Sequence, residues 1–376
     1  MPSDNHETRS SKKPVLQYAH ERLCDANVEK GDFWENKYTA ENITERIPPF
    51  VESDGDMRPV MPPNNWMIAQ DLTFDEYSKI LAPVFKMKRE HGIVEARAHT
   101  DGGGLVWGLT PHSYIHKMFE YVGADRDAEV LIFGSSGKNF FESIGPRDCY
   151  RDTSKPFEPM NEEDKEHNWI LYDHQYYDGT HDIESEVNID IPTIGIWHGG
   201  SFHSDLFLLC DITIATEDAW TTDTHFRLNM VPGDGIQIPW RMLMGQKRFA
   251  YAELTGEIIT ARKALQYGMV NEIVPDLESA YKRAWEIAEL IMRSGTRQTR
   301  RLTTQIIRKP VKEAVANELR GSFSTEMWNT LAEESPHHPL YWECAKAEAA
   351  AVMAAEKKGK VVKPRIGQFI EEELIK

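Results

Sequence analysis

Short apolar runs that end at glycine-containing turns recur through the middle of the chain. Residues 191–197 form one such run and lead into the Gly199-Gly200 turn, and residues 129–133 form another. Residues 211–215 alternate between polar and apolar positions like a strand. Apolar runs of this length, bounded by turn residues, are typical of buried strands. Because segments with helical character separate them, the pattern predicts an α/β fold with the sheet inside.

From residue 247 onward, apolar positions recur at helical spacing, so this part of the chain is predicted to be helical. The predicted helices cover residues 248–254, 261–267, 279–293, 303–307, 311–331 and 343–356. Gly256 and Gly268 are the expected stops of the first two. Earlier in the chain, a helix is predicted to begin at Thr110, whose hydroxyl is the expected N-cap, and to run to Tyr121.

Composition and pattern divide the chain into four regions. Residues 1–83 form an N-terminal extension with proline-rich loops and a polar start that we expect to be disordered. Residues 84–275 carry the α/β pattern, residues 276–331 are helical, and residues 332–376 form a tail. We expect the extension either to wrap around its own core or a neighbouring subunit, or to act as a lid over the active site.

Charge and cysteine usage narrow the class of protein. The net charge is −17, which argues against nucleic acid or an anionic membrane as the main partner. The sequence contains no apolar run near the roughly 18 residues that cross a bilayer, and its polar start has no signal-peptide pattern. The cysteines are widely spaced and form no CxxC pair; they are Cys24, Cys149, Cys210 and Cys344. We therefore expect reduced thiols in a cytoplasmic protein.

Residues 198–240 carry the strongest chemical signal. Two histidines, His203 and His225, and two acids, Asp205 and Asp234, lie at the turns of this stretch rather than inside its apolar runs. Turns on a rigid scaffold are where catalytic groups are usually placed. We therefore expect the active site in this stretch.

An ordered set of motifs over residues 84–330 resembles the crotonase (enoyl-CoA hydratase/isomerase) superfamily. The motifs are Gly199-Gly200, Cys210-Asp211-Ile212, VPGDG at 231–235, LTG at 254–256, Thr260-Ala261 with Ala264, GMV at 268–270, and Val274-Pro275. The resemblance implies an α/β fold built as a crotonase-like spiral of ββα units, with C-terminal helical trimerisation elements. It also implies a homotrimer or a dimer of trimers, and a structural role for Asp211. The N- and C-terminal extensions exceed the usual length of the family.

The departures from the hydratase pattern point to one branch of this superfamily. Where the CoA-ester hydratases carry two glutamates, this chain has Asp205 and His225, and Phe202 lies near the position of an oxyanion-hole glycine. The set is similar to that of β-diketone hydrolases of the 6-oxocamphor hydrolase type. The matching catalytic positions are His203, His225, Asp234, Trp107 and a late-helix glutamate, which is either Glu326 or Glu318.

Cleavage of a C–C bond between two carbonyls by water (a retro-Claisen step) needs a base, carbonyl polarisation and a proton for the departing enolate. We expect His225 to be the base, with Asp234 as the carboxylate that orients it. His203, the Trp107 indole and backbone amides near Phe141 and Glu142 are the expected donors to the oxygens. Glu326 or Asp205 is expected to hold His203. The expected substrate-binding residues are Phe141, Glu142, Phe202 and Asp205.

The sequence thus predicts a cofactor-independent hydrolase that converts a small, cyclic β-diketone into a keto acid, with no metal. A CoA-thioester enzyme of the same superfamily is the main alternative, and a non-catalytic scaffold with this fold is the second. A metal site formed by His203, Asp205, His225 and Asp234 would lack the close HxH or HxxxH spacing of many metal sites. The GGSFH run at 199–203 departs from a serine-hydrolase elbow. Trp107 could also be a plain core aromatic, Asp205 a helix-dipole charge and Glu326 a solvated helix residue.

Overall fold

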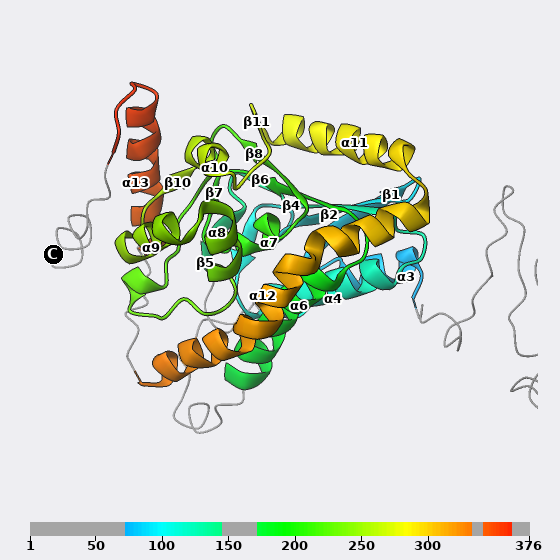
Figure 1. The fold of residues 1–376 in the computed structure, drawn as a ribbon, viewed down its shortest axis with the longest axis horizontal. Helices are drawn as coiled ribbons and strands as arrows, with labels where there is room; N and C mark the ends of the chain where they lie inside the picture. The colour runs from blue at the N-terminus through cyan, green and yellow to red at the C-terminus, as the bar shows by residue number, and fades with distance from the viewer. Residues whose placement is uncertain (1–71, 145–170, 333–340, 363–376) are drawn as a thin grey trace, which may run out of the picture. The chain divides into compact units, whose positions relative to one another are not determined.

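The computed structural model describes residues 72–144, 171–332 and 341–362. The predicted N-terminal extension lies outside this part except for residues 72–83, and so does the tail beyond residue 362. Cys24 and Cys149 are outside it too. Figure 1 gives the arrangement of the described helices and strands, whose labels are used below.

Three sheets form the β structure of the described residues. The strands are β1 Phe85–Glu90, β2 Ile93–Ala98, β3 Leu105–Trp107, β4 Val130–Ser135, β5 Phe141–Ile144, β6 Thr193–Trp197, β7 Gly200–Ser201, β8 Ile212–Thr216, β9 Trp220–Thr221, β10 Ile259–Thr260 and β11 Glu272–Val274. The largest sheet has the order β1-β2-β4-β6-β8-β11; β1 and β2 are antiparallel, and the other neighbours are parallel. Strands β10-β9-β7 and β3-β5 form the smaller sheets. Strands β4, β6 and β8 confirm the three predicted strands.

Helices follow most of the strands and fill the C-terminal half of the chain. They are α3 Phe74–Leu81, α4 Leu109–Ala124, η2 Leu171–Tyr177, α6 Asp178–Asn188, α7 Asp205–Leu208, η3 Phe226–Leu228, α8 Gln237–Met244, α9 Gln246–Thr255, α10 Ala261–Tyr267, α11 Leu277–Ser294, α12 Arg297–Ala332 and α13 Tyr341–Glu356. Here η2 is a π-helix and η3 a 3₁₀-helix. Gly256 and Gly268 end α9 and α10 as predicted, at φ values of 60° and 79° that favour glycine.

Two helix predictions need correction. Gly108, not Thr110, is at the N-cap position of α4, and no side chain caps that end. The two helices predicted over 303–307 and 311–331 are parts of the single helix α12, which continues through Pro310. A proline removes one backbone donor, and tertiary contacts on both sides of it can hold the rest of a long helix together.

The largest sheet is covered by helices on both faces (Figure 1). On one face, Val130 and Ile132 of β4 pack against the small residues Ala280 and Ala284 of α11 within one buried cluster. On the other face, the ring of Phe133 contacts that of Phe119 on α4, with centroids 5.4 Å apart. Successive side chains of a strand point to opposite faces of the sheet, so β4 contributes to the core on both faces.

A buried arginine ties α12 to three other elements. Arg308 is 2% exposed, and its Nε and Nη2 donate to Asp211 Oδ1 and Oδ2 at 2.8 and 2.9 Å. Its Nη1 donates to the backbone carbonyls of Glu186 and Ile189, each at 2.9 Å. Asp211 Oδ2 also accepts the backbone N–H of Thr193 at 2.8 Å. One guanidinium therefore joins α12 to the end of α6 and the starts of β6 and β8.

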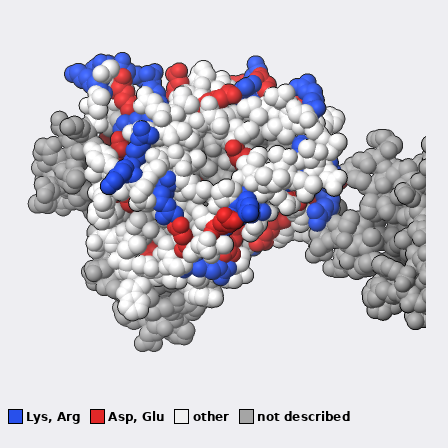
Figure 2. Space-filling view, in the orientation of Figure 1, with Lys and Arg blue, Asp and Glu red and all other residues white. Residues whose placement is uncertain are grey.

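Charged side chains of both signs are mixed on the surface. On the face shown in Figure 2, Lys and Arg side chains lie next to Asp and Glu side chains on a surface that is otherwise uncharged. Among the described helices, none combines the length and apolar character that a bilayer crossing requires.

We expect Arg308→Ala to lower the free energy of unfolding by about 3–5 kcal/mol, because the mostly buried Asp211 carboxylate is left without its partner. Arg320→Ala is the matched control, since Arg320 also lies on α12 and contacts Glu184 with both Nε and Nη2 at 2.8 Å. Its side chain is 58% exposed, so its loss should cost about 0–1 kcal/mol. Urea unfolding of both variants measures the difference, and equal losses would contradict the anchoring role of Arg308.

Candidate active site

A cavity of about 160 Å³ lies among α4, α6, α7, α12 and the segment that follows β9. Most of the predicted catalytic residues belong to its wall. The wall consists of Trp107, Gly108, His112, Gln175, Gly179, Asp182, Ile183, Phe202, His203, Asp205, Leu206, Thr224, His225, Leu228, Met230, Asp234, Phe323, Glu326 and Met327. Gln175 comes from the π-helix η2, a rare element that often occurs at functional sites.

Asp223 fixes the orientation of His225. Its Oδ1 accepts both the backbone N–H of His225, at 2.9 Å, and the ring Nδ1–H, at 2.7 Å. Asp223 is 2% exposed, so both hydrogen bonds are shielded from water. Since Nδ1 is engaged by the carboxylate, the ring presents Nε2 to the cavity.

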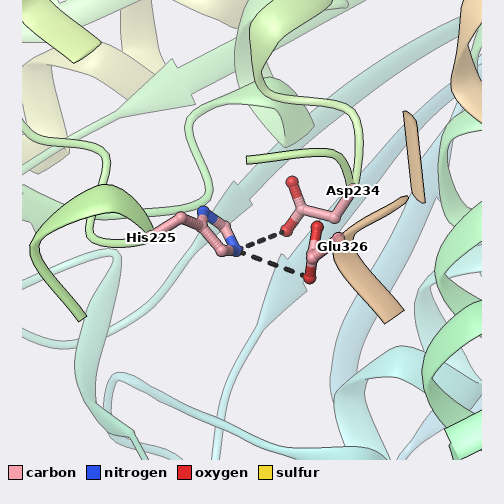
Figure 3. Close-up of side chains that lie close together, drawn as sticks. All are labelled: His225, Asp234 and Glu326. Carbon is pink, nitrogen blue, oxygen red and sulfur yellow. Dashed lines mark ion pairs between the residues drawn. The ribbon is translucent and has the colours of Figure 1, made fainter. Parts of the chain in front are cut away.

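His225 Nε2 faces two carboxyl groups (Figure 3). It lies 3.4 Å from Asp234 Oδ2 and 3.8 Å from Glu326 Oε1. Both separations are longer than a good hydrogen bond. Glu326 Oε2 accepts the backbone N–H of Gly233 at 3.0 Å, so this side chain joins α12 to the Pro-Gly turn that carries Asp234.

Asp234 also lies beside the second histidine. His203 Nδ1 is 3.4 Å from Asp234 Oδ2 and 3.5 Å from Asp205 Oδ1. The rings of His203 and His225 are 6.1 Å apart, and Trp107 packs on His203 with centroids 4.3 Å apart. One carboxylate oxygen therefore lies between two imidazoles in the cavity wall.

The buried carboxyl groups control the charges of the site. Burial alone would lower the pKa of His225, but Asp234, Asp223 and Glu326 together raise it well above its ordinary value. Burial would also lower the pKa of His203, and the charges of Asp234 and Asp205 raise it above the usual range.

The two central acids shift in opposite directions. Burial would raise the pKa of Asp234, yet the nearby His225 and His203 hold it well below its usual range. Burial and the charge of Asp234 raise the pKa of Glu326 well above its ordinary value. These shifts favour an ionised Asp234 between two protonated imidazoles, and a protonated Glu326.

A second pair of acids lies behind His225, and sequence reasoning missed both members. Burial and the charge of Asp223 raise the pKa of Glu253 to about 9, so Glu253 keeps its proton near Asp223. The Asp223-Thr224-His225 spacing was a signal available in the sequence. Nothing in the sequence near Glu253 marked it, because its place depends on the packing of α9.

One predicted role differs from this geometry, and one pair of alternatives is decided by it. The contact that orients His225 at Nδ1 comes from Asp223, whereas Asp234 lies on the Nε2 side. Between the two candidates for holding His203, the carboxylate in contact is Asp205, since Glu326 faces His225 instead. Glu326 faces His225 because α12 approaches the site from the side of the Pro-Gly turn.

Of the remaining predicted residues, Phe202 is in the cavity wall and Phe141 stacks behind it, with centroids 4.6 Å apart. Glu142 points away from the cavity wall of the described residues, and its carboxylate accepts from the backbone N–H of Lys138 and the side-chain amide of Asn139 at 3.1 and 2.9 Å. The competitor Glu318 forms an ion pair with Arg241. Glu326 is thus the late-helix glutamate that α12 brings to the site.

The same residues could also approach a metal ion. His225, Asp234 and Glu326 each offer one ligand atom, and these atoms lie within 4.8 Å of one another (Figure 3). Ligand groups must give up their protons to bind a metal. The pKa values of His225 and Glu326 are both raised, so a cation here would have to displace their protons.

Comparison with known sequences agrees with the fold. The family model for enoyl-CoA hydratase/isomerase matches residues 159–334. A probable peroxisomal enoyl-CoA hydratase from Arabidopsis thaliana is 26% identical over 183 residues, which cover 47% of this chain. The matched segment spans 61% of the length of that curated relative.

Solved structures with this fold include one diketone hydrolase. A β-diketone hydrolase from the cyanobacterium Anabaena sp. PCC 7120, bound to (S)-3-oxocyclohexyl acetic acid, superposes with a TM-score of 0.61 and 26% identity over 70% of this chain and 100% of the other. An enoyl-CoA hydratase/isomerase from Mycobacterium paratuberculosis has a TM-score of 0.57 at 18% identity, over 67% of this chain and 95% of its own. The chain therefore has the crotonase fold, and its residues 159–334 match the enoyl-CoA hydratase/isomerase family.

Proposed function

We propose that this protein hydrolyses a C–C bond of a small β-diketone and releases a keto acid. The observation that carries the proposal is the placement of Asp234 between the imidazoles of His203 and His225 in the cavity wall. The similarity to the Anabaena β-diketone hydrolase supports it. The small volume of the cavity, about 160 Å³, is in keeping with a compact substrate.

In the proposed reaction, His225 activates water. Neutral Nε2 takes a proton from a water molecule held near Asp234, while Asp223 keeps the imidazole in place and stabilises the cation that forms. The resulting hydroxide adds to one carbonyl carbon. Because the carboxylates raise the pKa of His225, the form that accepts a proton is the minority form at neutral pH.

The second half of the reaction needs donors and a proton. Collapse of the tetrahedral intermediate breaks the bond between the carbonyl carbon and the carbon between the two carbonyls, and the electron pair leaves as an enolate. Cationic His203 is placed to stabilise negative oxygen in this partly dry site. The proton on His225 Nε2 then passes to the enolate carbon, so one water is consumed and one keto acid is formed.

A CoA-thioester reaction is the alternative that the family match favours. Its hydratases work with a pair of glutamates, and those two positions hold Asp205 and His225 in this chain. A water addition to an alkene would then depend on a carboxyl group whose pKa is raised by burial and on an imidazole that is cationic. The hydratase reaction therefore lacks its pair of glutamates here, whereas the proposed hydrolysis uses the two imidazoles that flank Asp234.

Purified protein with EDTA and without CoA should consume cyclic 1,3-diketones, and the keto acid should carry one oxygen from labelled water. His225→Ala and Asp234→Ala should each lower kcat by at least about 10²-fold, because each removes a group that moves or stabilises the transferred proton. His181→Ala is the matched control, since His181 lies on α6 outside the cavity wall. Turnover of crotonyl-CoA without turnover of any diketone would favour the CoA-thioester alternative.

The pH dependence of kcat/KM should report the charge of His225. We expect the rate to rise with pH through an apparent pKa above 6.5, because only neutral His225 accepts a proton. Asp223→Asn removes a negative charge that raises this pKa, so the rising limb should move to lower pH while kcat falls by up to about 10⁴-fold. Asp218→Asn changes an exposed acid and should leave the limb in place. An unmoved limb in Asp223→Asn would rule out His225 as the titrating base.

A further inference from the structure

Helix α6 places a row of acids along one buried face. Asp178, Asp182 and Glu186 are four residues apart, so they lie on the same side of the helix. All three are buried where α6 packs against α4, α7 and α12. Asp182 belongs to the cavity wall, whereas its two neighbours in the row do not.

Asp182 has one oxygen engaged and one available. Its Oδ1 accepts the backbone N–H of His116 at 2.8 Å, and its Oδ2 has no hydrogen-bond partner among residues 72–144, 171–332 and 341–362. The residue is 3% exposed and contributes to the cavity wall. An oxygen without a protein partner in the wall of a cavity is available to a ligand there.

The surroundings keep this acid protonated. Burial raises the pKa of Asp182 well above its ordinary value, and the charges of Asp178, Asp205 and Glu186 add to the rise, against one hydrogen bond from the His116 amide. No basic side chain of the described residues forms an ion pair with it. A neutral carboxyl group has an O–H that can donate, which a carboxylate lacks.

Asp178, one turn earlier, shows the contrast. It accepts from Ser113 Oγ at 2.7 Å and lies 3.6 Å from His116 Nε2. Burial would raise the pKa of Asp178, but the hydrogen bonds from His116 and Ser113 lower it below the usual value. Asp178 is therefore an ionised acid with hydrogen bonds from protein groups, whereas Asp182 is a neutral acid with one oxygen that lacks a protein partner.

Helices α6 and α12 pack closely beside Asp182. Gly179 lies one turn before Ile183 and beside Asp182, and a Cβ on it would approach the ring of Phe323 to 2.6 Å. The missing side chain allows α12 to pack tightly on α6, and both residues contribute to the cavity wall. Asp182 thus lies at a fixed position on a rigid, two-helix side of the cavity.

We propose that neutral Asp182 donates a hydrogen bond from its carboxyl group to the substrate oxygen that becomes the enolate oxygen. The inference rests on the proposed function. His225, Asp234 and Glu326 mark the end of the cavity where water attacks the first carbonyl, and the oxygen of the second carbonyl then needs a donor elsewhere on the wall. A protonated acid in an apolar site can stabilise an enolate without adding negative charge beside it.

Two substitutions separate donation from packing. Asp182→Asn keeps an acceptor for the His116 amide and offers an N–H in place of the O–H, so kcat should stay near that of the wild type. Asp182→Leu has a similar size and no donor, so kcat should fall by about 10²–10³-fold with a smaller change in KM. Glu186→Gln and Glu186→Met are the controls, because Glu186 is on the same buried face outside the cavity wall.

The kinetic outcomes decide between roles. Equal losses in Asp182→Asn and Asp182→Leu would mean that Asp182 acts as an ionised or proton-transferring group, which overturns the proposal. Wild-type kinetics in Asp182→Leu would reduce Asp182 to a packing residue and overturn it too. Thermal unfolding of all four variants checks that they fold.

A measurement without substrate tests the protonation directly. The infrared difference spectrum of wild type minus Asp182→Asn at pH 7 should contain the C=O stretch of a protonated carboxylic acid. Its absence would overturn the proposal even if Asp182→Leu fails to fold. If this band is present but the wild type turns over no diketone, Asp182 is a neutral acid and the proposed reaction is wrong. The proposed contact with the enolate oxygen is then wrong as well.

Discussion

The placement of α12 depends on one buried ion pair. Arg308 is bound by Asp211 on two nitrogens and by two carbonyls at the end of α6, so α12, α6 and the sheet are fixed relative to one another. The active-site cavity lies further along the same two helices, where α12 contributes Phe323 and Glu326 and α6 contributes Gly179 and Asp182. This guanidinium outside the cavity, together with the apolar packing of Ile183 and Val187 against Val315 and Leu319, therefore holds its two helical walls together.

The chemistry of the cavity follows from an excess of carboxyl groups in a site with little water. Every buried acid must either find a cation or keep a proton. Asp234 finds two imidazoles and stays ionised, whereas Glu326 and Glu253 keep their protons. The histidines in turn hold their protons more tightly than free histidine does. The protonation state of each residue thus depends on the whole set of neighbouring acids and histidines. One substitution should therefore change the pKa values of several residues at once.

The sequence was sufficient for features that depend on local pattern. Apolar runs predicted β4 and β6, alternation predicted β8, and the glycines at 256 and 268 predicted two helix ends, because strand burial and left-handed caps each leave a local signature. The join of two predicted helices into α12 across Pro310 was missed, because tertiary contacts such as those of Arg308 compensate for the lost backbone donor.

The residues of the site divide in the same way into those that a local motif predicts and those that only the folded packing brings together. His203, His225, Asp234 and Trp107 lie in motifs that a sequence reader can match, and they line one cavity. Asp223 is adjacent in sequence and still escaped notice, because an acid two residues before a histidine is common without any contact. Asp182 and Glu253 belong to helices whose burial is decided by long-range packing, so no spacing in the sequence marks them.

Replacing a glutamate by His225 changes what this scaffold can do with water. A carboxylate pair acts through its low basicity and needs no further support, whereas an imidazole needs a partner to fix its tautomer and orientation. Asp223 supplies that partner from the turn after β9, and the proton on Glu253 prevents a second negative charge from forming behind it. The surroundings of His225 thus depend on two further buried acids, which come from the segment after β9 and from α9.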